Sequence, residues 1–212
     1  LPEATDDIRL MPYEVAYRYA RDSLQLSQYK LGTENIAMVD GRLSWVFPLV
    51  PDGLIIMFTL QNKGMTYVDA TAQERNSRMV WQDMQIGEGM QIRDNLWWNL
   101  YRYRFFVTTE DPYYIPYEND VYTIVPTVSY SHHFRWGLWY TVPRFEGCFL
   151  VDSAGNIELL TPEAAREHPV LEDNIIFPEY LTRLYVSSHQ YNEGIINRFF
   201  IHNDQIQIQD IS

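Results

Sequence analysis

Residues 147–160 constrain the fold most, because two apolar segments there are separated by a segment of turn-forming residues. Residues 148–151 have the apolar density of a buried strand, and residues 157–160 begin a second one. Between them, residues 152–156 supply Asp, Ser, Gly and Asn, which favour turns for steric and hydrogen-bonding reasons. The stretch therefore predicts an antiparallel β-hairpin.

A similar order of elements occurs earlier in the chain. Apolar side chains at helical spacing predict a helix over residues 13–27, and Asp40–Gly41 marks a tight hairpin turn after it. Val68–Asp69 then ends an apolar segment, as Val151–Asp152 does later, and a second helix is predicted from Asp94. We therefore expect an α+β protein of two related helix-plus-antiparallel-sheet units with additional C-terminal helices.

The predicted boundary between the two units lies near residues 86–93, where two glycines mark a connector. The first unit is expected to span residues 1–90, and the second, with its helical extension, residues 91–212. Further elements are expected as strands over 54–60, 134–142 and 205–209 and as helices over 161–167, 177–188 and 192–201.

Charge and composition exclude several functional classes. The 28 acidic and 16 basic residues give a net charge of −12, and no Lys/Arg run offsets it, so no nucleic-acid partner is expected. Cys148 is the only cysteine, which excludes an intrachain disulfide, and its apolar neighbours predict a small buried hydrophobic side chain. No apolar stretch of about 18 residues is present, so any membrane anchor is expected outside this sequence.

No strong catalytic or metal-binding motif is present. The chain lacks a Gly-x-Ser-x-Gly motif, a Walker loop and a dinucleotide motif, and His132 and His133 would point to opposite faces of a strand. Acidic pairs such as Glu110–Asp111 are expected to be solvated loop charges. We expect no catalytic residue, cofactor or metal ligand. A hydrolase acting on carbohydrate or peptide, with carboxylates and histidines assembled by the fold, stays open as an alternative.

The aromatic segment 134–140 is the most distinctive candidate surface. Read as one strand, it places Trp136 and Tyr140 on one face and Arg135 and Trp139 on the other. One face is expected to be core and the other to be covered, by a neighbouring helix in preference to a partner. Arg135, Trp136, Trp139 and Tyr140 are therefore the candidate binding residues.

The order of helix, hairpin and strand-turn resembles the PepSY-type unit of extracytoplasmic bacterial proteins. Residues Val151, Asp152, Gly155 and Ile157 form a Val-Asp-x-x-Gly-x-Ile strand-turn that is similar to the Val-Asp-Ala-x-x-Gly-x-Val pattern ending such units, and residues 68–70 match the first half of that pattern. The pair of units also resembles extracytoplasmic regions of large bacterial membrane proteins. The resemblance implies a small α+β binding or inhibitory module that has no catalytic residues.

These observations lead to the expectation of a non-enzymatic, extracytoplasmic interaction or regulatory domain of a membrane-anchored protein. Its expected partner is a protein, which includes other parts of the same membrane protein, and the membrane is reached through a segment outside this sequence. A structural component of a phage or secretion assembly is a further alternative. The oligomeric state is left open.

Overall fold

The computed structural model describes residues 10–53, 55–71, 77–174 and 176–188. These residues form two compact units. The first unit contains the described residues up to Val128 together with Glu146–Ile176, and the second contains Ser129–Phe145 and the described residues from Phe177 on. The strand content and the antiparallel pairing confirm the predicted α+β class.

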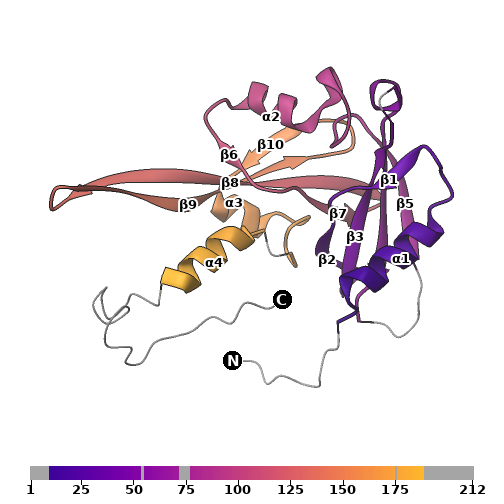
Figure 1. The fold of residues 1–212 in the computed structure, drawn as a ribbon, viewed down its shortest axis with the longest axis horizontal. Coiled ribbons are helices and arrows are strands. Elements are labelled where there is room, and N and C mark those ends of the chain that lie inside the picture. Colours follow the sequence, from indigo (N-terminus) through magenta and orange to yellow (C-terminus); the bar gives the residue numbers. More distant parts are fainter. Residues whose placement is uncertain (1–9, 54, 72–76, 175, 189–212) are drawn as a thin grey trace. The chain divides into compact units, whose positions relative to one another are not determined.

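The first unit contains two antiparallel sheets (Figure 1). One sheet has the order β1-β3-β4-β5, with β2 also paired to β3. Its strands are β1 (Tyr29–Leu31), β2 (Asn35–Val39), β3 (Arg42–Pro51), β4 (Asn62–Asp69) and β5 (Ser77–Met84). In Figure 1, α1 (Tyr13–Ser23) lies across one face of this sheet, where Ala16 and Ala20 are buried against Phe47 and Val68. The predicted first helix is therefore confirmed, although it ends before Ser27.

The other sheet has the order β10-β9-β8-β6, with β7 also paired to β8. Its strands are β6 (Thr108–Thr109), β7 (Tyr113–Tyr117), β8 (Asp120–Arg135), β9 (Leu138–Val151) and β10 (Ile157–Leu160). The helix α2 (Leu96–Tyr103) buries Leu96 and Leu100 against Phe149 of β9. Its N-cap is Asn95, whose side chain accepts a hydrogen bond from the backbone N–H of Trp98. The helix therefore starts one residue later than the prediction from Asp94.

The hairpin predicted at residues 147–160 is confirmed. Val151 of β9 pairs with Ile157 of β10, and the Asp152 carboxylate accepts a 2.8 Å hydrogen bond from the backbone N–H of Asn156. Gly155 has a φ of +83°, a conformation that glycine adopts at little cost. After the hairpin, Thr161 caps α3 (Pro162–Glu167), because its hydroxyl accepts a hydrogen bond from the N–H of Ala164.

Both sheets contribute to one hydrophobic core in the first unit. Val46 and Met65 of the first sheet belong to the same buried cluster as Ile124 and Leu150 of the second. Asn35 strengthens this junction, as its amide oxygen accepts from the Tyr114 N–H at 2.9 Å and its amide nitrogen donates to the Tyr114 carbonyl at 3.2 Å. Residues on both sides of position 90 thus fold together, and the division into two related units over 1–90 and 91–212 stays a prediction.

The expectation of a buried strand over residues 54–60 is wrong. The segment forms a short 3-10 helix, η1 (Ile56–Phe58), and its side chains Ile55 and Phe58 are 80% and 64% exposed. An apolar run without alternation does not distinguish a strand from a helical turn, and here the Met57 N–H bonds back to the Gly53 carbonyl. The helix predicted at 192–201 and the strand predicted at 205–209 lie outside the described residues.

The described residues of the second unit form a β-ribbon and one helix. Residues 129–135 of β8 and 138–145 of β9 form the ribbon, and α4 (Glu179–Ser188) confirms the helix predicted near residues 177–188. Phe177 lies 5.4 Å from Phe145 between ring centroids, and the Tyr185 hydroxyl donates to the Pro143 carbonyl at 2.9 Å. The helix therefore supports the end of the ribbon away from its turn. A two-stranded ribbon needs such support to be stable in water.

Candidate functional site

The β8–β9 ribbon turns through two residues, Trp136 and Gly137. Their φ values are +56° and +79°, so both central residues of the turn are in the left-handed region. This geometry is that of a type I′ turn, whose twist matches the right-handed twist of the two strands. We call residues 134–140 the hairpin tip.

Contacts across the ribbon assign the side chains to its two faces. Phe134 lies 4.9 Å from Trp139 between ring centroids, and His133 stacks on Tyr140 at 5.1 Å with an interplanar angle of 19°. Because neighbours along a strand alternate between faces, the Phe134–Trp139 pair and the His133–Tyr140 pair lie on opposite faces. The ribbon therefore carries aromatic side chains on both sides.

The prediction of one strand over residues 134–142 is wrong. The chain reverses at Trp136–Gly137, so the faces differ from the prediction: Trp139 shares a face with Phe134, which a single strand would place on the opposite face, and Trp136 lies in the turn. Gly137 was the available signal, since a glycine inside a strand pattern often marks a bend. It was missed because type I′ turns usually have Asn, Asp or Gly at the position that Trp136 occupies.

The expectation that a neighbouring helix covers this segment is also wrong. Trp136 is 88% exposed, Trp139 77% and Leu138 70%, and Phe134 and Tyr140 are 60% and 45% exposed. In Figure 1, α4 lies nearer the base of the ribbon than its turn. The tip thus exposes two tryptophans and three other large apolar side chains in one contiguous segment, which is a typical property of binding surfaces.

Among the described residues, two other two-residue hairpin turns have positive φ at both central positions, as the tip has. Asp40–Gly41 joins β2 to β3 with φ values of +51° and +72°, and Glu118–Asn119 joins β7 to β8 with values of +48° and +65°. In both, the first position holds an acidic residue. Tryptophan at that position is costly, because a side chain with a bulky Cβ substituent is disfavoured at positive φ. Of these three turns, the tip is the one that has a bulky aromatic residue at the first position.

A scan against protein-family models and searches of curated proteins and of solved structures found no match. The function is therefore inferred from this chain's own residues and their geometry.

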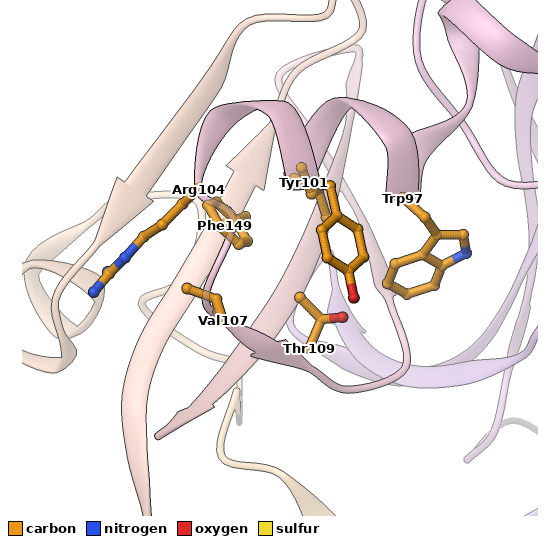
Figure 2. A pocket seen from close by; sticks show the side chains of 7 residues that line it. Trp97, Tyr101, Arg104, Val107, Thr109 and Phe149 are labelled. Carbon is orange, nitrogen blue, oxygen red and sulfur yellow. The ribbon is translucent and has the colours of Figure 1, made fainter. Parts of the chain in front are cut away.

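Two hollows lined by described residues of the first unit do not resemble a hydrolase cleft. One lies beneath α2, where Trp97 and Tyr101 descend towards Thr109 (Figure 2), and its volume of about 10 Å³ has room for about one water. A second, of about 280 Å³, is lined by residues 57–61 with Lys63 and Asp94. Neither hollow is lined by a histidine. Among the described residues, no group of three or more His, Cys, Asp or Glu side chains is placed to hold a metal ion.

One half-buried acidic residue, Glu88, was missed by the sequence interpretation. The Tyr114 hydroxyl donates to the Glu88 carboxylate at 3.1 Å, and burial raises the pKa of Glu88, with the hydrogen bond from Tyr114 opposing the rise and Asp111 adding to it. A carboxyl group with a raised pKa is a candidate general acid. Glu88 lines neither hollow, however, and its described contact connects the segment after β5 to β7.

The prediction that Cys148 is a buried hydrophobic side chain is confirmed. It is fully buried in the shared core, and burial raises the pKa of its thiol to about 12. The thiolate, which is the reactive form, is therefore scarce at neutral pH.

Proposed function

We propose that this chain is a non-enzymatic interaction domain of a membrane-anchored bacterial protein, situated on the extracytoplasmic face and binding through the hairpin tip. The observation that carries the proposal is Trp136, which is 88% exposed and held at positive φ. Backbone conformations that cost free energy cluster at functional sites. The resemblance of residues 151–157 to the end of PepSY-type units supports the extracytoplasmic location and two related units.

The tip is rich in the residue types that contribute most of the binding free energy at protein interfaces. Tryptophan, tyrosine and arginine are enriched among the residues that contribute most to interfaces, and the tip contains Trp136, Trp139, Tyr140 and Arg135. Cross-strand ring contacts hold Trp139 against Phe134 and Tyr140 against His133, so these two side chains have less rotamer entropy to lose on binding. The bound state would therefore bury a preformed surface.

Cysteine labelling in intact cells tests the location and the contact together. We expect Asp40→Cys, at the exposed polar turn, to react with a membrane-impermeant maleimide at the same rate in cells and in the purified chain. Arg135→Cys keeps every aromatic residue of the tip, and we expect it to react several-fold more slowly in cells, because its partner covers it. The unsubstituted chain is the background control, since Cys148 is buried and has a pKa of about 12.

Two results would contradict the proposal. If Asp40→Cys reacts only after the membrane is broken, the extracytoplasmic location is wrong. If Arg135→Cys reacts equally fast in cells and in the purified chain, the tip is not an occupied binding surface.

A further inference from the structure

We infer that the hairpin tip binds the interfacial region of an anionic lipid bilayer. The inference rests on the proposed function, because it names what the tip contacts. Among the described residues, no helix is long and apolar enough to cross a bilayer. The contact inferred here is a shallow insertion of one β-turn.

The distribution of apolar side chains favours lipid over a protein groove. Phe134 and Trp139 lie on one face of the ribbon, Tyr140 lies on the other, and Trp136 extends from the turn between them. A groove on a protein typically covers one face of such a ribbon. A bilayer interface surrounds an inserted tip on every side, so all of these exposed side chains would be removed from water together.

The side-chain types at the tip suit the boundary between headgroups and acyl chains. Tryptophan and tyrosine have a large apolar ring and one polar group, and they concentrate at membrane–water interfaces for that reason. Arg135 flanks the turn and is exposed. Its aliphatic stem can lie along the apolar region while the guanidinium group reaches the phosphates.

The charge of the ribbon differs from that of the whole chain. None of the 28 acidic residues lies between positions 121 and 145, although the net charge is −12. The same stretch contains Arg135 and Arg144, together with the two histidines His132 and His133. An anionic surface therefore attracts the ribbon while it repels the remainder of the chain, which would orient the tip towards the bilayer.

The ribbon is long enough for the tip to enter the interface alone. At about 3.3 Å per residue, the strand from Ser129 to Arg135 spans roughly 20 Å. The interfacial layer that amphipathic elements occupy is about 5–10 Å deep. The support of the ribbon by α4, at Pro143 and Phe145, would therefore stay in water.

Vesicle sedimentation with the full 212-residue chain tests this inference. The probes are vesicles of phosphatidylcholine containing phosphatidylglycerol, and vesicles of phosphatidylcholine alone. We expect the chain to sediment with the first, and Phe134→Thr combined with Trp136→Asn to weaken the partition about tenfold or more, because two rings leave the interface. Arg135→Gln is expected to weaken binding to the phosphatidylglycerol vesicles only.

The matched control removes one tryptophan and one phenylalanine elsewhere. Trp98 and Phe106 are 55% and 91% exposed in the first unit, and Trp98→Asn combined with Phe106→Thr should change the partition less than about twofold. Equal losses in the two double variants, or no sedimentation of the unsubstituted chain, would overturn the lipid inference. If Arg135→Cys is nevertheless protected in cells, the partner is a protein and the proposed function stands. If it is unprotected, both proposals are wrong.

Discussion

Gly147→Ala is expected to lower the free energy of unfolding by about 3–5 kcal/mol. Gly147 has a φ of +131°, and a Cβ atom there would overlap the carbonyl oxygen of Leu160. The positive φ and the overlap with the Leu160 carbonyl both involve backbone atoms, so no side-chain rotation can relieve them. The hairpin of β9 and β10, whose carbonyl at Gly147 also accepts a 2.9 Å hydrogen bond from Thr127, would have to distort. Denaturant unfolding measures the loss.

Gly41→Ala is the matched control for this substitution. Gly41 also has a positive φ, of +72°, but no atom lies within 4 Å of the place that its Cβ would occupy. The expected loss is therefore the conformational cost alone, about 1 kcal/mol. Similar losses in the two variants would show that the close approach of β9 to Leu160 is not what requires glycine.

Asn35→Ala is expected to lower the free energy of unfolding by about 2–4 kcal/mol. The side chain of Asn35 is buried and makes two hydrogen bonds to the backbone of Tyr114, one as donor and one as acceptor. Alanine would leave both backbone groups of Tyr114 without these partners in the interior. Because Asn35 and Tyr114 belong to different sheets, the loss also measures how strongly the two sheets depend on each other.

Asn62→Ala is the comparison that isolates the hydrogen bonds. Asn62 is fully buried as well, but neither polar atom of its side chain has a hydrogen-bond partner among the described residues. Its replacement removes an unsatisfied polar group, so thermal or denaturant unfolding should show a smaller loss than for Asn35→Ala. An equal loss would mean that burial, and not the bonding of Asn35 to Tyr114, stabilises the junction.

Local chemistry made several elements predictable from the sequence. Residues 152–156 form a turn because an Asp side chain bonds the backbone ahead of it and Gly155 takes positive φ. Thr161 begins a helix because its hydroxyl replaces a missing backbone acceptor. In each case the partners are only a few residues apart, so a sequence pattern contains the whole interaction.

Other features depended on contacts that no local pattern contains. Asn35 and Tyr114 are 79 residues apart, so the joining of the two sheets was not predictable from either segment. The large apolar side chains of Ile55 and Phe58, at η1, are exposed, which an apolar run does not reveal. The candidate residues 135–140 were identified by their aromatic content, but their arrangement was missed because Trp136 occupies a turn position that normally excludes it.

Amide hydrogen exchange of the ribbon in the Trp136→Asn variant tests most directly whether Trp136 serves binding or the stability of the ribbon. Asparagine is favoured at this position of a type I′ turn, whereas Trp136 is held there at a φ of +56°. If Trp136 serves binding and not folding, the amides of residues 129–145 should exchange at the same rate in the variant or up to about fivefold more slowly, since a gain of about 1 kcal/mol is available. Faster exchange in both strands would show that Trp136 stabilises the ribbon, and would contradict the account.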